Sequence, residues 1–213
     1  MNTTEKYHGI VPAFYACYEE DGSISPDRAR KLTRHLIHKG VQALYVGGSS
    51  GECIYQTAAE RKLLLEAVIE EAAGQLPVYA HVACNSIEES RMLAAHAQAP
   101  GAAAIFAIPP IYFHLPESSI ADYWNAISDA APETDFFIYN IPQLAGVALS
   151  PSLFKKMREN PNVIGVKNSS MPVQDIQIFK ALGGEDSIVF NGPEEQFVGG
   201  RLMGADGGIG GTS

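Results

Sequence analysis

Short apolar segments alternate along this chain with longer segments in which apolar and charged residues recur at helical spacing. Apolar runs of about four to eight residues, bounded by glycine or polar residues, are typical of strands buried in a parallel sheet. This pattern predicts eight strands, at residues 10–17, 43–47, 78–83, 103–108, 136–141, 163–167, 188–191 and 208–210.

The segments between these strands carry helix signals. An N-cap residue before a proline, or a serine or threonine followed three residues later by glutamate, marks a helix start. Such signals are found at Ser25 with Pro26, Thr57 with Glu60, Ser86 with Glu89, and Ser150 with Pro151. The sequence therefore predicts a helix after each of the first seven strands.

Strict strand–helix alternation predicts an α/β fold with a parallel sheet, and eight strands can close into a TIM (β/α)8 barrel. An open doubly wound sheet would favour a Gly-x-Gly-x-x-Gly turn after the first strand, and residues 18–22 contain none. We expect residues 1–213 to form one barrel domain. Because a barrel adds a helix after its last strand, we also expect a C-terminally incomplete chain, without the eighth helix and the C-terminal helices.

Composition narrows the function. The chain has 213 residues, 46% of them hydrophobic, and a net charge of -9, which argues against a nucleic-acid partner. No apolar stretch is long enough for a transmembrane helix, and the start is unlike a signal peptide. Cys17, Cys53 and Cys84 are odd in number and widely spaced, which favours a reducing cytoplasm. His81 lies close to Cys84 in sequence, but two possible ligands alone do not predict a metal site.

Lys167 is the first candidate for chemistry. It ends a run of apolar residues, so its amine is expected in a low-dielectric environment that favours the neutral, nucleophilic form. The alternative is a lysine that marks where the strand reaches solvent. In a TIM barrel the carboxyl ends of the strands build the active site, so the other strand ends decide between the two interpretations.

Those ends carry polar groups suited to a 2-oxo acid. Residues 47–52 form a glycine- and serine-rich turn able to hold a carboxylate, or simply a tight turn. Tyr139 could transfer protons, or could be a packed core tyrosine. Ser169 shares a face with Lys167. Glu194 and Glu195 could bind hydroxyl groups, or could be first-turn helix charges. Together these groups predict a Schiff-base aldolase, in which the lysine attacks a ketone.

Four strings in this order resemble the N-acetylneuraminate lyase / dihydrodipicolinate synthase family of class I aldolases. They are Gly-Gly-Ser-Ser-Gly-Glu at 47–52, Tyr-Asn-Ile-Pro at 139–142, Gly-Val-Lys at 165–167 and Gly-Ala-Asp-Gly-Gly-Ile-Gly at 204–210. The segment 139–146 is closer to the N-acetylneuraminate lyase branch, because the Arg-Thr-Gly typical of the synthases is missing.

The resemblance implies cleavage of N-acetylneuraminate, or a close 2-oxo-3-deoxy sugar acid, to pyruvate and an aldehyde. It implies Lys167 as the Schiff-base residue, Tyr139 as the proton acceptor, Ser49 and Ser50 as carboxylate ligands, and the Ser50 hydroxyl as the group orienting Tyr139. The implied residues on the sugar side or near the site are Ser169, Gly192, Glu194, Glu195 and Tyr112. It implies no cofactor or metal, and a homo-oligomer (tetramer or dimer) for the complete protein.

The chain departs from the lyases at Gly211, where they often have serine, and at Glu194, where aspartate is common. Three other functions stay open at this point. The same imine could support pyruvate–aldehyde condensation or sugar-acid dehydration, and the barrel could be a non-catalytic sugar-acid binding protein. A phosphate cradle at 207–211 is a weaker alternative, because no basic residue flanks it.

Overall fold

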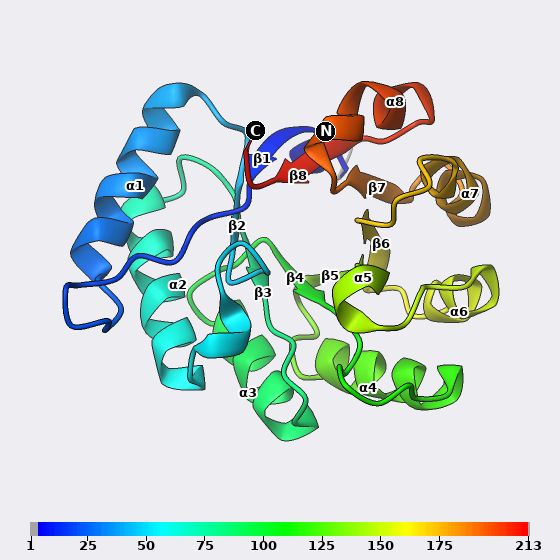
Figure 1. The fold of residues 1–213 in the computed structure, drawn as a ribbon, viewed down its shortest axis with the longest axis horizontal. Coiled ribbons are helices and arrows are strands. Elements are labelled where there is room, and N and C mark those ends of the chain that lie inside the picture. Colours follow the sequence, from blue (N-terminus) through cyan, green and yellow to red (C-terminus); the bar gives the residue numbers. More distant parts are fainter. Residues whose placement is uncertain (1–3, 213) are drawn as a thin grey trace.

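The computed structural model describes residues 4–212, which form a barrel of parallel strands surrounded by helices (Figure 1). The eight strands form one sheet in the order β1-β8-β7-β6-β5-β4-β3-β2. Their bounds are β1 Gly9–Pro12, β2 Leu44–Val46, β3 Val78–His81, β4 Ala104–Ala107, β5 Asp135–Asn140, β6 Val163–Asn168, β7 Ile188–Asn191 and β8 Gly207–Gly210. The predicted TIM-barrel fold is confirmed.

The barrel closes between β1 and β2 just beyond the end of β1. Ala13 forms a parallel bridge with Tyr45, and the Phe14 amide donates to the Tyr45 carbonyl at 2.8 Å. The prediction that the first strand extends to residue 17 was wrong, because β1 ends at Pro12. Past the bridge the chain leaves the sheet, and Tyr15 is exposed.

Helices follow the strands as expected and form the outer ring in Figure 1. Their bounds are α1 Pro26–Lys39, α2 Ala58–Ala72, α3 Ile87–Gln98, α4 Glu117–Asp129, α5 Pro142–Ala145, α6 Pro151–Met157, α7 Gln174–Gly183 and α8 Phe197–Leu202. Short 3-10 helices are η1 Glu5–Tyr7, η2 Cys53–Tyr55 and η3 Glu194–Gln196. Within residues 4–212, no helix has the length and apolar character needed to cross a membrane.

Capping residues fix where these helices begin. The hydroxyls of Ser25 and Ser150 accept hydrogen bonds from the backbone of α1 and α6, each followed by proline at the first helical position. Thr57 and Glu60 form the complete predicted capping box of α2. Ser86 accepts from the backbone of α3, which is one half of the box predicted there. These bonds satisfy amides that a helix end leaves unpaired.

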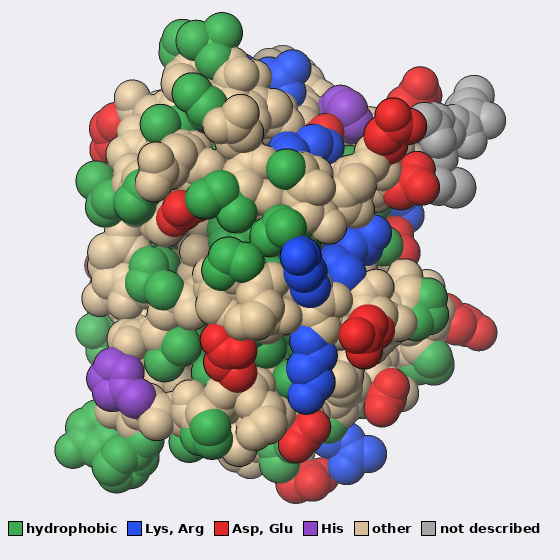
Figure 2. Space-filling model, turned by 90° about the vertical axis from the view of Figure 1, so that its right-hand side faces the viewer, with side chains coloured by type: hydrophobic (Ala, Val, Ile, Leu, Met, Phe, Trp, Pro, Cys, Tyr) green, Lys and Arg blue, Asp and Glu red, His purple; other side chains and the backbone are tan. Residues whose placement is uncertain are grey.

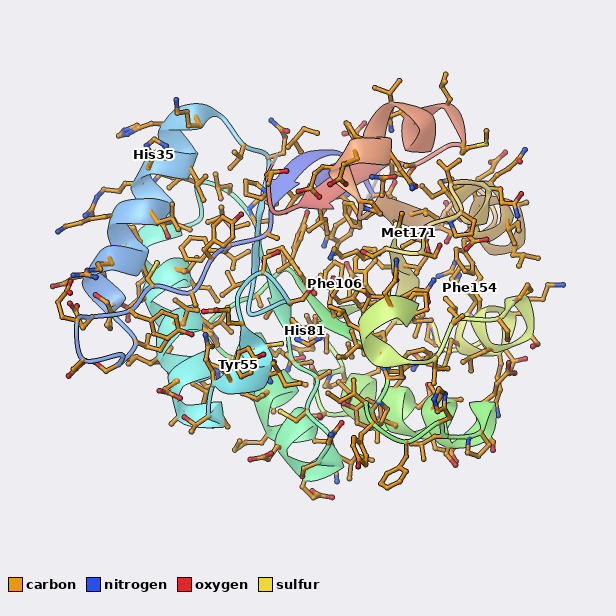
Figure 3. The ribbon with its side chains drawn as sticks, in the orientation of Figure 1. His35, Tyr55, His81, Phe106, Phe154 and Met171 are labelled. Carbon is orange, nitrogen blue, oxygen red and sulfur yellow. The ribbon has the colours of Figure 1, made fainter. Side chains whose placement is uncertain are left out.

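The interior of the barrel is filled by aromatic side chains. Phe106, labelled near the centre of Figure 3, stacks on Phe137 with ring centroids 4.5 Å apart and meets Tyr79 at 5.8 Å. Tyr7 closes the amino-terminal end, where its hydroxyl donates to Asp135 at 2.5 Å. The amino-terminal end of the barrel is therefore closed by packed side chains.

The surface over α6, α7 and α8 has a mixed character. Figure 2 faces this side and shows acidic and basic side chains interspersed, with hydrophobic side chains scattered singly or in small groups. Basic side chains form a row near the centre of this face, and acidic side chains lie beside that row.

Candidate active site

A cavity of about 300 Å³ opens at the carboxyl ends of the strands. It lies where the active sites of TIM barrels are built. Its lining residues are Ala13, Ser49, Ser50, Tyr139, Ile141, Gln143, Lys167, Ser169, Met171, Gly192, Pro193, Glu194, Ile209, Gly210 and Gly211. The structure thus brings together seven of the nine predicted site residues, and leaves out Glu195 and Tyr112.

Lys167 and Tyr139 are partners across neighbouring strands. They are opposite each other in the register of β5 and β6, so both side chains enter the barrel interior. Lys167 is 4% exposed and Tyr139 is 2% exposed. The Lys167 Nζ lies 3.6 Å from the centroid of the Tyr139 ring. The predicted buried position of Lys167 is therefore confirmed, and the interpretation that it marks where the strand reaches solvent was wrong.

Asn140 and Asn168, which directly follow Tyr139 and Lys167, lie on the other face of their strands and link the two strands by hydrogen bonds. Asn140 donates to Asn168 at 2.7 Å, and Asn168 donates to Ser170 at 2.9 Å. Ser170 in turn donates to Asp175 at 2.6 Å. A buried polar network with paired members is rigid, so it fixes the strand ends that carry Tyr139 and Lys167.

The environment of Tyr139 changes its acidity. Burial alone raises the pKa of the phenol, but the charge of Lys167 and hydrogen bonds with Lys167, Ser49 and Ser169 outweigh that effect. The pKa of Tyr139 is consequently lowered from its usual value of 10.0. A lowered pKa brings the tyrosine closer to the range in which a general base works.

The glycine- and serine-rich turn after β2 places the Ser49 hydroxyl beside the Tyr139 hydroxyl. Gly47 has φ of +72°, a left-handed conformation that favours glycine, and a Cβ at Gly48 would lie 2.4 Å from the Tyr45 ring. The turn they allow sets Ser49 Oγ 2.9 Å from Tyr139 Oη. The assignment of this orienting contact to Ser50 was wrong, because Ser50 lines the cavity further along, near Gly211.

The opposite wall is formed by the segment after β7. A Cβ at Gly192 would lie 1.9 Å from Ser169 Oγ and 2.9 Å from the Asn168 backbone oxygen, so this close approach favours glycine. Glu194 Oε1 accepts from the Thr212 amide and hydroxyl, each at 2.6 Å. Desolvation raises the pKa of Glu194, but these hydrogen bonds outweigh it and hold the pKa below its usual value. Glu194 is therefore an ionised acceptor at the cavity wall, whereas Glu195 is exposed outside it.

Tyr112 lies away from the cavity, on the loop between β4 and α4. It is 86% exposed and its ring meets that of Phe113 at 4.9 Å. Among residues 4–212, it does not contribute to the cavity lining.

Sequence reasoning missed Gln143, a lining residue with a distinctive contact. Gln143 donates to the Ser169 carbonyl at 3.0 Å, and its place directly after Pro142 at the carboxyl end of β5 was the available signal. Gly211 was named from the sequence, but its contact was not: its carbonyl accepts a hydrogen bond from the Tyr15 hydroxyl at 2.5 Å. No periodicity pairs residues so distant in sequence.

Comparison with known proteins agrees with this geometry. The model of the dihydrodipicolinate synthetase family matches residues 6–213. The chain belongs to this family. The predicted membership of a Schiff-base aldolase family is therefore confirmed.

Relatives in the family carry the lyase name. An N-acetylneuraminate lyase from Mediterraneibacter gnavus is 63% identical over 212 residues, which are 100% of this chain and 67% of that protein. One from Citrobacter koseri is 36% identical over 204 residues, 96% of this chain and 68% of that protein. A solved structure described as a Ruminococcus gnavus sialic acid aldolase catalytic lysine mutant has a TM-score of 0.98 at 63% identity, and the match covers 100% of this chain and 70% of that one.

Among residues 4–212, His, Cys, Asp and Glu side chains do not gather in groups of three that could hold a metal ion. Arg61 lies between His81 and Cys84, and donates to the Cys84 sulfur at 3.1 Å. A guanidinium in that position is incompatible with a cation shared by the two side chains.

Proposed function

We propose that this chain cleaves N-acetylneuraminate reversibly to pyruvate and N-acetylmannosamine, through a Schiff base on Lys167. The observation that carries the proposal is the burial of Lys167 against Tyr139, beside the turn with Ser49 and Ser50. The names of the relatives supply the substrate class.

The reaction follows from what each group can do. The neutral Lys167 amine adds to the C2 ketone, and loss of water gives the imine. Tyr139 takes the proton of the C4 hydroxyl, the C3–C4 bond breaks, and its electron pair moves toward the imine nitrogen. N-acetylmannosamine leaves as the aldehyde. The remaining enamine takes a proton at C3, and water then releases pyruvate and restores the amine.

The serines have separate tasks in this scheme. Ser49 and Ser50 hold the C1 carboxylate, and Ser49 also keeps the Tyr139 oxygen in position. A carboxylate fixed next to the ketone places C2 against the lysine, which makes the attack effectively intramolecular.

On the sugar side, Ser169, Gly192 and Glu194 meet the hydroxyl-bearing chain of the substrate. The exposed Glu195 and Tyr112 act there only if the ligand or a neighbouring subunit reaches them. We therefore also propose a homo-oligomer, a dimer or tetramer, in which the exposed Tyr112 contacts another copy. A cytoplasmic location accords with three unpaired cysteines.

The direct test is pyruvate release from N-acetylneuraminate, measured alongside other 2-oxo-3-deoxy sugar acids. The proposal predicts turnover with N-acetylneuraminate, and none for Lys167→Ala. Turnover only with a different sugar acid would contradict the substrate, and equal turnover by the Lys167→Ala variant would contradict the mechanism.

A further inference from the structure

Two glutamines hold the loop that follows β6 by its backbone carbonyls. Gln143, at the start of α5, donates from Nε2 to the Ser169 carbonyl at 3.0 Å. Gln196, in η3, donates from Nε2 to the Met171 carbonyl at 2.8 Å. Met171 is labelled on this loop in Figure 3. Of the two glutamines, Gln143 alone lines the cavity.

Gln143 has hydrogen-bonding capacity to spare. A primary amide has two N–H donors and one carbonyl acceptor, and a backbone carbonyl such as that of Ser169 can only accept. This fixes which end of the amide meets the loop. Among residues 4–212, the Gln143 side chain makes no other hydrogen bond, and the residue is exposed at the cavity. One N–H donor and the carbonyl oxygen are therefore available to a ligand.

The position of Gln143 along the cavity indicates which part of the substrate it meets. Ser169, whose backbone carbonyl Gln143 contacts, lines the cavity together with Tyr139. In the proposed reaction Tyr139 faces the C4 hydroxyl, so the neighbouring Gln143 faces the next carbon, C5. In N-acetylneuraminate C5 carries an acetamido group, which has one N–H donor and one carbonyl acceptor. The acetamido N–H can donate to the Gln143 carbonyl oxygen, and the acetamido carbonyl can accept from the remaining Gln143 N–H.

We propose that Gln143 recognises the acetamido group of the substrate and sets the preference for N-acetylmannosamine as the aldehyde product. This inference rests on the proposed lyase function. A sugar with a hydroxyl at the same carbon lacks the acetyl carbonyl, so it satisfies only part of the Gln143 amide. A site that hydrogen-bonds a group of its substrate discriminates against an analogue that lacks this group.

The test uses the condensation direction, with pyruvate and either N-acetylmannosamine or mannose. For Gln143→Ala we expect the KM for N-acetylmannosamine to rise about tenfold, as for loss of one hydrogen bond, while the KM for pyruvate changes by less than about twofold. The preference for N-acetylmannosamine over mannose, measured as the ratio of kcat/KM values, falls by a similar factor. Gln143→Met, close in size but without the amide, gives the same result should the alanine variant fold poorly.

Gln196→Ala is the matched control, because it removes a glutamine that holds the same loop without lining the cavity. It leaves the sugar preference unchanged. An unchanged preference in both Gln143 variants, or an equal loss in Gln196→Ala, would overturn the proposal and reduce Gln143 to a support for the loop. A wild-type chain that condenses neither sugar with pyruvate would overturn the lyase function itself, a result separate from an active enzyme with unaltered preference.

Discussion

The Nζ of Lys167 lies 3.6 Å from the centroid of the Tyr139 ring, and the two residues are register partners on β6 and β5. This relationship couples their chemistry. When Lys167 is protonated, its charge helps to lower the pKa of the Tyr139 phenol. The register of the paired strands thus sets the separation between the proposed nucleophile and the proposed base.

The Tyr139→Phe variant separates imine formation from proton transfer in the proposed reaction. The variant keeps Lys167, so imine formation with pyruvate persists, but it has no group to accept the C4 proton. We expect kcat for cleavage to fall about 10²–10⁴-fold. Steady-state cleavage rates and borohydride trapping of pyruvate measure the two steps. Equal loss of both would mean that the tyrosine is mainly structural.

Tyr45→Phe is the control for that variant. The buried Tyr45 hydroxyl has no hydrogen-bond partner among residues 4–212, and its ring packs edge-on against Tyr139. Its removal should therefore leave the chemistry in place.

Ser49→Ala tests the pH dependence of the base. The hydrogen bond from Ser49 lowers the Tyr139 pKa, so its loss raises that pKa. A base works in its deprotonated form, so activity increases as the pH rises through the Tyr139 pKa. We expect the pH profile of kcat in Ser49→Ala to shift toward higher pH. Ser50→Ala, which keeps the contact to Tyr139, should weaken substrate binding without this shift, and the same shift in both variants would contradict the assignment.

Gly165→Ala tests how closely β6 and β7 approach below the reactive lysine. A Cβ at Gly165 would lie 1.9 Å from the backbone oxygen of Ile188, so the strands must separate. We expect a loss of about 3 kcal/mol in the free energy of unfolding, measured by denaturant titration. Gly199→Ala in α8 meets only ordinary contact, at 3.4 Å from Val173, and should stabilise the helix by about 0.5–1 kcal/mol. Similar effects of the two substitutions would contradict this packing.

His81 gives the fold a defined acid sensitivity. Complete burial, with the nearby charges of Arg61 and Lys167, holds the His81 pKa well below its usual 6.5. Below pH 6.5, His81 takes up a proton in the unfolded chain but not in the folded chain. The free energy of unfolding therefore decreases as the pH falls, by up to about 1.4 kcal/mol per pH unit. We expect this slope in unfolding experiments below pH 6.5 and a shallower one in His81→Gln. Parallel slopes for the two proteins would refute the assignment.

The sequence and the structure agree where topology decides the outcome. Lys167, Tyr139 and Ser169 could be predicted because strand ends in a parallel barrel meet at one rim, and the strand positions follow from apolar runs. Which of Ser49 and Ser50 contacts Tyr139 could not be predicted, because it depends on the left-handed conformation of Gly47 within an irregular turn. Such turns follow local dihedral angles and not a hydrophobic period.

Contacts formed by loops were beyond prediction for a related reason. Gln143 reaches Ser169 across 26 positions in sequence, and the exposed Tyr112 lies outside the cavity lining. The positions of both residues are set by loop geometry, which carries no repeating pattern. The end of β1 was misplaced because apolar residues continue after Pro12 although the chain has left the sheet.

The central claim is that the buried amine of Lys167 forms an imine with the 2-oxo acid. Borohydride reduction of the protein with pyruvate, followed by peptide mass spectrometry, tests it most directly. We predict a stable pyruvate-derived adduct on Lys167 in the wild-type chain and in Tyr139→Phe, and none in Lys167→Ala. An unmodified Lys167, or an adduct on another lysine that persists in Lys167→Ala, would contradict the account.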